Sequence, residues 1–190
     1  MEYDFILASS SPRRLALLNQ AGIVPKRVES PNVHEDMGEN EPILKYVKRM
    51  AREKALAVSR LYPDDNVMAA DTVVVCGNRI LFKTDDKEQA RRNLQLLSGR
   101  RHKIITAVCL IDKDKKETVK SVVAKVKFKR LSSEEINNYL ETDEWKGKAG
   151  SYAIQGRAEC FVQTMLGSWS NVVGLPLCET VNLLQKTKER

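Results

Sequence analysis

The sequence predicts an α/β protein in which a mixed, twisted central sheet is flanked by helices. Strand-like apolar runs alternate with segments whose apolar residues recur every three or four positions. Residues 67–76 form a β-branched apolar run, as in a central strand buried on both faces. Residues 118–130 alternate apolar residues with lysines, as in a strand with one solvated face. Together these patterns favour interleaved helices and strands.

The length predicts a single domain, residues 1–190, built as one large unit or as two small lobes, and two lobes would leave a cleft between them. The smaller lobe is expected at roughly 113–145, where a lysine-rich hairpin precedes a helix. With 42% hydrophobic and 30% charged residues, the chain is neither a disordered tail nor a collagen-like protein. Aromatic residues are only 6%, which disfavours a row of stacking platforms for single-stranded nucleic acid.

Turn and cap signals define the elements of the N-terminal half. Ser11 is expected to cap a helix that has Pro12 at its first position and ends at Gly22. The predicted elements are strands at 4–9 and 24–30, a loop at 31–41, helices at 12–21 and 42–61, the strand at 67–76 and its hairpin partner at 79–82.

The C-terminal half is predicted in the same way. Asp86 is expected to cap a helix that closes near residue 97, and Ser132 with Glu135 forms a capping box. The predicted elements are those two helices, the second reaching about residue 141, strands at 103–111, 118–130, 151–154 and 160–166, and a last helix at 176–185.

Charge and cysteine usage restrict the partners and the compartment. The net charge of +7 suits an anionic small molecule as well as nucleic acid. No two cysteines form a C-x-x-C motif, and Cys76 and Cys109 lie in apolar runs typical of buried, reduced thiols. The first eight residues lack the basic region and the long apolar stretch of a signal peptide, so a cytoplasmic location is expected.

The segment Ser9–Arg14 is the first candidate binding site. It joins a predicted strand to a predicted helix, where backbone N–H groups and the helix dipole attract anions. Basic residues are unfavourable at such a position by themselves, so Arg13 and Arg14 favour a bound phosphate. The ordinary alternative is a serine cap beside two solvated arginines.

Two acidic residues are the candidates for metal binding or proton transfer. Asp71 lies inside the apolar run 67–76, where a carboxylate needs a cation, a metal or an opening to solvent. Pairing with a structural arginine is the alternative. Glu35 belongs to a polar loop and would need a second carboxylate, for which Asp71 is the obvious candidate.

Two lysines and two histidines carry weaker signals. Lys54 is expected on the polar face of the long helix, where a solvated side chain is the default. Lys83 follows a strand end, which is a better place for a phosphate contact. His34 and His102 show no zinc spacing and are expected to be solvated or close to a helix.

A glycine-rich segment, Gly147–Gly156, is the last candidate. Three glycines within ten residues indicate tight turns or backbone close to a ligand. The amide of Gln155 could contact a base edge, since it both donates and accepts hydrogen bonds. No phosphate-loop motif and no nucleophile elbow is present, so the usable chemistry is that of carboxylates, basic residues and a metal.

Several of these motifs, taken in order, resemble the Maf family over almost the whole chain. The matching segments are Ile6–Arg14, Ala70–Val74, Leu97–Gly99 with His102, Gly147–Gly156 and Asn171–Leu177. The resemblance implies a nucleoside triphosphate pyrophosphatase, a house-cleaning hydrolase of nucleotide metabolism. Such an enzyme uses Mg²⁺ or Mn²⁺ to release a nucleoside monophosphate and pyrophosphate. It also implies a fold similar to inosine triphosphatases and a homodimer.

Roles for single residues follow from the resemblance. Asp71 would be the general base or the metal-bound carboxylate that orients water, and Glu35 would hold the metal with it. The residues implied to handle the triphosphate are Ser9, Arg13, Arg14, Lys54 and Lys83.

Arg13, Thr72 and Gln155 match the branch of the family that acts on dTTP, UTP and modified uridine triphosphates. One position departs from the family. Lys83 is followed by Thr84 instead of proline, which frees a backbone angle, so looser positioning of Lys83 is expected.

Two other functions compete with this interpretation. The protein could be a nucleotide-binding regulator that affects septum formation and cell division, with hydrolysis incidental. It could also bind RNA or DNA through the face formed by Lys125, Lys127 and Lys129, although the scarcity of aromatic residues argues against this. That lysine face is better explained as a device that keeps an edge strand soluble.

Overall fold

A computed structural model describes residues 3–188, so residues 1–2 and 189–190 of the predicted domain lie outside it. The chain forms two compact units. The first comprises Met1–Asp71, Thr106–Val122 and Gly174–Arg190, and the second Thr72–Ile105 and Val123–Val173. Residues 113–145, where the smaller lobe is predicted, are therefore divided between the two units. No described helix is long and apolar enough to cross a membrane.

The predicted α/β class is confirmed. The described strands form a seven-stranded mixed sheet in the order β2-β1-β3-β5-β6-β7, and β4 pairs with β3 outside this path. β1 pairs in parallel with β2 and β3, whereas β4 and β7 pair antiparallel with β3 and β6. The strands are β1 (Ile6–Ala8), β2 (Arg27–Glu29), β3 (Val67–Cys76), β4 (Arg79–Leu81), β5 (Arg101–Ile111), β6 (Glu117–Phe128) and β7 (Val162–Leu166).

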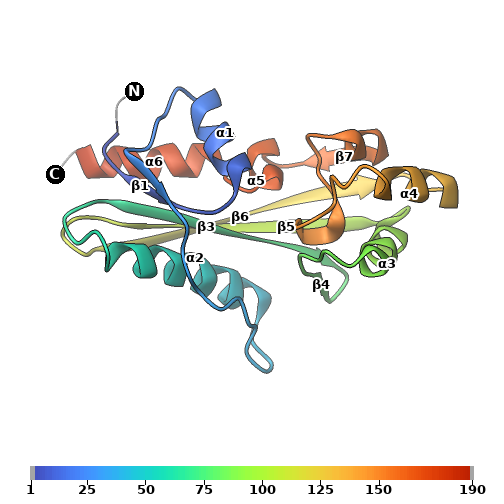
Figure 1. Ribbon diagram of the computed structural model, residues 1–190, viewed down its shortest axis with the longest axis horizontal. Coiled ribbons are helices and arrows are strands. Elements are labelled where there is room, and N and C mark those ends of the chain that lie inside the picture. Colours follow the sequence, from blue (N-terminus) through green and yellow to red (C-terminus); the bar gives the residue numbers. More distant parts are fainter. Residues whose placement is uncertain (1–2, 189–190) are drawn as a thin grey trace. The chain divides into compact units, whose positions relative to one another are not determined.

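In the first unit, helices cover both faces of the sheet. Figure 1 shows α1 (Pro12–Gln20) and α6 (Leu177–Lys188) on one side of the strands and α2 (Ile43–Ser59) on the other. The apolar residues in the middle of α2 that recur every three or four positions are buried, as the sequence predicts, whereas Ile43 is only half-buried and Leu61, beyond the end of the helix, is exposed. Because β3 is covered on both sides, residues 67–70 are completely buried.

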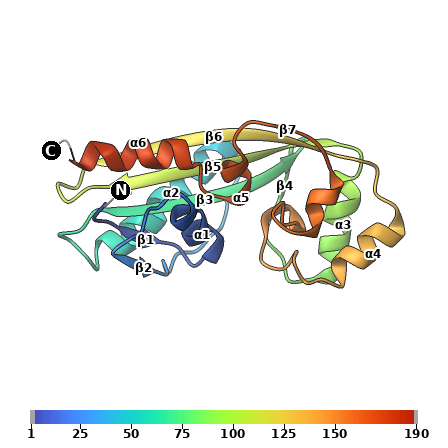
Figure 2. The same cartoon turned by 90° about the horizontal axis from the view of Figure 1, so that it is seen from above.

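In the second unit, α3 (Lys87–Leu97) and α4 (Ser133–Leu140) lie side by side (Figure 2). Both predicted caps are confirmed. The Asp86 carboxylate accepts from the Glu88 N–H at 2.9 Å, and Ser132 forms the full capping box with Glu135. A short helix, α5 (Trp169–Val173), was not expected from the sequence.

Two local predictions are wrong. The segment predicted as a strand at 151–154 begins in a 3₁₀ turn, Ala149–Ser151, and the left-handed φ values of Gly150 (74°) and Ser151 (58°) keep the chain from extending there. The last strand starts at Val162, after a second 3₁₀ turn at Arg157–Phe161. Ser11 is the N-cap residue of α1 with Pro12 at the first helical position, as predicted, although its side chain makes no cap hydrogen bond.

The lysine face and one histidine also differ from expectation. β6 is not an edge strand over its lysines, because Lys125 and Lys127 pair with Leu166 and Thr164 of β7. His102 is neither solvated nor beside a helix, but 2% exposed in β5. Its Nε2 lies 2.9 Å from the Tyr152 hydroxyl, and burial lowers the pKa of His102 to about 4. The ring is therefore neutral at pH 7.

The cysteines divide into two classes. As predicted, Cys76 and Cys109 are buried free thiols, whereas Cys160 and Cys178 are exposed. Burial, supported by the charge of Glu117, raises the pKa of Cys109 to about 12. A thiol with so high a pKa has almost no thiolate at neutral pH, and its burial also keeps reagents away.

We therefore expect a thiol reagent to modify two cysteines of the folded protein rapidly and the other two only in denaturant. Dithionitrobenzoate titration with and without guanidinium would count them. The control is the variant that combines Cys160→Ser with Cys178→Ser, which should show no rapid reaction. Rapid modification of three thiols in the native protein would contradict the burial of Cys76 and Cys109.

Candidate functional site

The segment between β1 and α1 forms a polar cluster in the first unit. The side chain of Ser9 is buried, and its Oγ accepts from the Ser11 N–H at 3.1 Å and from Arg14 Nη1 at 3.2 Å. Arg14 is also buried, and its Nε donates to the Gly174 carbonyl at 2.9 Å. In both of its contacts Ser9 Oγ is an acceptor, so its O–H can still donate to an anion.

The charge of Arg14 interacts with its surroundings. Its pKa is lowered, mainly by burial, and the nearby Arg13 adds to the effect. The carboxylates of Asp71 and Glu35 act in the opposite direction. The two arginines and the two carboxylates therefore lie close enough to influence one another, as expected for parts of one site.

Lys54 joins the two predicted carboxylates. Its Nζ lies 2.5 Å from Asp71 Oδ1 and 2.6 Å from Glu35 Oε1. The side chains of Lys54 and Asp71 are only 5% and 4% exposed, whereas that of Glu35 is 41% exposed. The expectation of a solvated Lys54 is thus wrong. The residue follows Met50 by one turn on the buried face of α2, and its ion pair with Asp71 makes the burial tolerable.

The two carboxylates fit a hard divalent cation. Both bind the same ammonium, so the two carboxylates lie next to each other. Mg²⁺ prefers oxygen ligands and is usually held by one or two carboxylates together with waters and substrate phosphates. Within residues 3–188 there is no cluster of three or more His, Cys, Asp or Glu residues that could hold a metal alone. The donor set therefore fits a cation that binds together with a phosphorylated substrate.

The remaining predicted residues, Thr72, Lys83 and Gln155, belong to the second unit. Thr72 is half-buried on β3, and Lys83 is exposed after β4. Thr84, which follows Lys83, forms hydrogen bonds through both its side chain and its backbone. Its hydroxyl accepts from the Asp86 N–H at 3.1 Å, and its carbonyl accepts from the Gly147 N–H at 3.3 Å.

Gln155 is exposed in a turn whose backbone is fixed by a residue that the sequence analysis missed. Glu144 Oε2 accepts from the Arg157 N–H at 2.8 Å. A Cβ on Gly156 would lie 2.1 Å from the same oxygen, so only glycine fits there unless Glu144 moves. The conformation next to Gln155 thus depends on Glu144 and Gly156 together.

The structure brings the six predicted residues of the first unit into one cluster, while the other three lie in the second unit. Sequence reasoning missed Tyr46 and Arg49 of α2. Tyr46 donates to the Glu35 carbonyl at 2.8 Å, and Arg49 donates to the Asp36 carbonyl at 2.9 Å. The only signal for Arg49 was its spacing of four residues from Glu53, which is common on exposed helix faces.

Comparison with known proteins finds matches along almost the whole chain. The family model described as Maf-like protein matches residues 4–187. The chain is 52% identical over 181 residues to a protein of Anaplasma phagocytophilum named nucleoside triphosphate pyrophosphatase, covering 95% of this chain and 94% of that one. It is 50% identical over 185 residues to the dTTP/UTP pyrophosphatase of Rhodospirillum rubrum, covering 97% and 88%.

Among solved structures, the chain is similar to a nucleoside-triphosphatase, or dITP/XTP pyrophosphatase, from Mycobacterium abscessus. The two share 18% sequence identity with a TM-score of 0.44, and the match covers 68% of this chain and 75% of that chain.

The buried pair of Lys54 and Asp71 leads to a stability prediction. Lys54→Met leaves the Asp71 carboxylate buried without its main cation, so we expect a loss of about 3–5 kcal/mol in the free energy of unfolding. In an Asp71→Asn background the same substitution should cost clearly less, because no charge is stranded. Urea unfolding of the four proteins measures the coupling. Additive effects of the two substitutions would contradict the pairing.

Proposed function

Because the chain belongs to the Maf-like family, we propose that it hydrolyses dTTP, UTP and modified uridine triphosphates to the nucleoside monophosphate and pyrophosphate. The observation that carries this proposal is the buried Asp71 carboxylate, held by Lys54 beside Glu35 and near the cationic Arg14. The names of the two relatives described above support the same reaction.

The first task of the site is to bind a triphosphate, which carries about four negative charges. Ser9 Oγ would donate a hydrogen bond to a phosphate oxygen, while Arg13, Arg14, Lys54 and Lys83 supply positive charge. Arg13 and Arg14 lie in the first turn of α1 and Ser9 just before it, so the positive end of the helix dipole adds to the attraction of an anion. Arg14 itself is held by Ser9 and by the Gly174 carbonyl, so its charge is fixed in place.

Glu35 and Asp71 would hold a Mg²⁺ or Mn²⁺ ion, which supplies positive charge that offsets the phosphate oxygens and the leaving pyrophosphate. The fit of the two carboxylates to such an ion is the support for this part of the proposal. Lys54 holds the two carboxylates next to each other, and it also offsets their mutual repulsion.

Asp71 would orient the attacking water and accept its proton. The water oxygen forms a bond to the α-phosphorus, the bond from that phosphorus to the α–β bridging oxygen breaks, and pyrophosphate leaves with the bond's electrons. A side chain on a central strand is held more rigidly than one on a loop, which suits a residue that must aim at a single atom.

Gln155, with Arg13 and Thr72, would set the choice of base. The imide edge of uracil or thymine has two carbonyl acceptors and one N–H donor, and a glutamine amide matches both kinds of group. The fixed turn at Gly156 limits the directions in which Gln155 can point.

Cytoplasmic location and a homodimer stay predictions.

The test of the proposed function is pyrophosphate release from a panel of nucleoside triphosphates with Mg²⁺, repeated with EDTA. We expect release from UTP and dTTP, little from ATP or GTP, and none with EDTA. Release mainly from 7-methyl-GTP would keep the reaction and overturn the base assignment. A protein that binds UTP without turnover would instead be a nucleotide-binding regulator.

In the same assay, Asp71→Asn tests the proposed proton acceptor, because asparagine keeps the shape of the side chain but cannot accept the proton. Its kcat should fall at least about 100-fold, while binding of a non-hydrolysable UTP analogue changes little. A near-normal kcat for this variant would show that the proton acceptor lies elsewhere.

Gln155→Glu tests the base assignment separately. A carboxylate only accepts hydrogen bonds, so it repels the two carbonyls of a pyrimidine imide. We expect kcat/KM for UTP to fall about 10- to 100-fold, with a much smaller change for GTP. Steady-state kinetics on both nucleotides measures this selectivity, and an unchanged ratio would remove Gln155 from base recognition.

A further inference from the structure

Glu35 differs from the other proposed cation ligand in its support. Asp71 lies on β3, whereas Glu35 belongs to the segment between β2 and α2, which has no regular secondary structure at residue 35. A ligand on a loop is imprecise unless its backbone is held from outside. The geometry of the proposed cation site thus depends on whatever fixes this segment.

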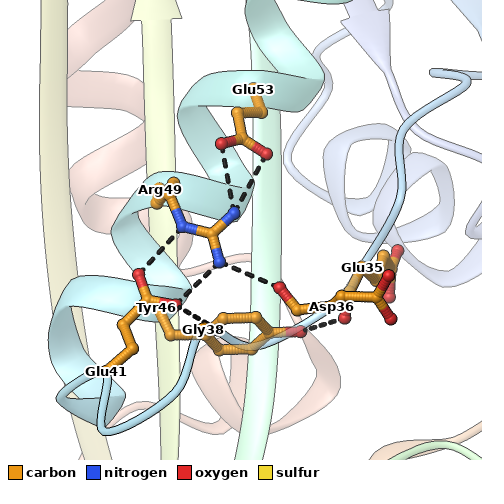
Figure 3. A network of polar contacts seen from close by, with 7 residues as sticks. All are labelled: Glu35, Asp36, Gly38, Glu41, Tyr46, Arg49 and Glu53. Carbon is orange, nitrogen blue, oxygen red and sulfur yellow. Dashed lines mark hydrogen bonds and ion pairs between the residues drawn. The ribbon is translucent and has the colours of Figure 1, made fainter.

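Arg49 of α2 fixes the segment at two places. Its Nη2 donates to the Asp36 carbonyl at 2.9 Å, directly after Glu35. Its Nε and Nη2 also bind the two oxygens of Glu41 at 2.8 and 2.7 Å. Glu41 Oε2 in turn accepts from the Gly38 N–H at 3.1 Å. One guanidinium therefore holds both ends of the segment 36–41 against the helix, as Figure 3 shows.

The same guanidinium is itself held in place. Nη1 of Arg49 donates to both carboxylate oxygens of Glu53 at 3.1 and 3.2 Å, one turn further along α2. The Arg49 side chain also lies over the ring of Tyr46, 5.5 Å from its centre. The hydrogen bond from Arg49 lowers the pKa of Glu41 to about 2, so this ion pair persists throughout the neutral pH range.

Tyr46 adds a contact with the backbone of Glu35 itself. Its hydroxyl donates to the carbonyl of Glu35 itself at 2.8 Å. Lys54, two turns later on α2, holds the Glu35 carboxylate at 2.6 Å. Three residues of one helix thus fix the carbonyls of Glu35 and Asp36 and the end of the Glu35 side chain.

Resting on the proposed function, we propose that Arg49 and Tyr46 are positioning residues that fix Glu35 for cation binding together with Asp71. Neither residue needs to touch the substrate or the metal. Arg49 suits this role because its planar fork bonds Glu41, Glu53 and a carbonyl at the same time, and the single ammonium of a lysine does not reproduce that pattern. Substitution of a residue that holds a metal ligand in place commonly lowers metal affinity 10- to 100-fold.

The test is direct Mn²⁺ binding, followed by electron paramagnetic resonance of free Mn²⁺, with a non-hydrolysable UTP analogue present. Arg49→Lys and Tyr46→Phe should each weaken Mn²⁺ binding about tenfold or more. The matched control is Arg52→Lys on the same helix. Arg52 forms a similar bidentate ion pair with Glu117 but does not contact the segment that carries Glu35. Its Mn²⁺ affinity should equal that of the wild type.

A Glu35→Gln background separates positioning from general stability. If Arg49 acts through Glu35, then Arg49→Lys should weaken Mn²⁺ binding no further once the Glu35 carboxylate is gone. An equal loss of Mn²⁺ affinity in both backgrounds would overturn the proposal. Wild-type Mn²⁺ affinity in both Arg49→Lys and Tyr46→Phe would also overturn it. Tyr46→Phe, which removes a single hydroxyl, decides the question if circular dichroism shows that Arg49→Lys is unfolded.

Failure of this inference is distinguishable from failure of the proposed function. Pyrophosphate release by the wild type, with unchanged Mn²⁺ affinity in both variants, would remove the positioning role and leave the function intact. A wild type that neither binds Mn²⁺ with the analogue nor releases pyrophosphate would overturn both.

Discussion

The ion pair of Lys54 and Asp71, with both side chains almost fully buried, is the interaction on which the candidate site depends. Transfer of either charge alone into the apolar layer between α2 and β3 would cost several kcal/mol. The pair therefore fixes the position of α2 along β3, since a shift of either by one residue would leave both charges buried without a partner. It also sets where a third group, the carboxylate of Glu35, can lie.

Around this pair, the protein holds its charged groups with polar contacts to backbone as well as to side chains. Arg14 is fixed by the Gly174 carbonyl and Ser9, and Arg49 by the Asp36 carbonyl and two glutamates. Backbone partners do not change protonation and do not rotate, so they orient a guanidinium more firmly than solvent does. The cations of the proposed triphosphate site thus have positions that are set without a ligand.

Much of the fold was predictable, because periodicity, caps and turns are local signals. Strand 67–76 and the caps at Asp86 and Ser132 are confirmed for this reason. The errors arise where distant contacts decide. Lys54 and His102 look like surface residues by type, and only Asp71 and Tyr152, far away in sequence, explain their burial. Arg49 escaped notice because its contacts with the loop are invisible to helix periodicity.

Stability does not explain why a carboxylate occupies the middle of an otherwise apolar strand. Buried ion pairs can often be replaced by apolar residues of similar size with no loss of stability. An apolar residue at position 71 and another at position 54 would satisfy β3 and α2 equally well. The charges therefore need a reason outside packing, and the proposed activation of water by Asp71 beside a triphosphate would supply one. By the same argument, the contacts of Arg49 and Tyr46 matter for the direction in which Glu35 points more than for the free energy of folding.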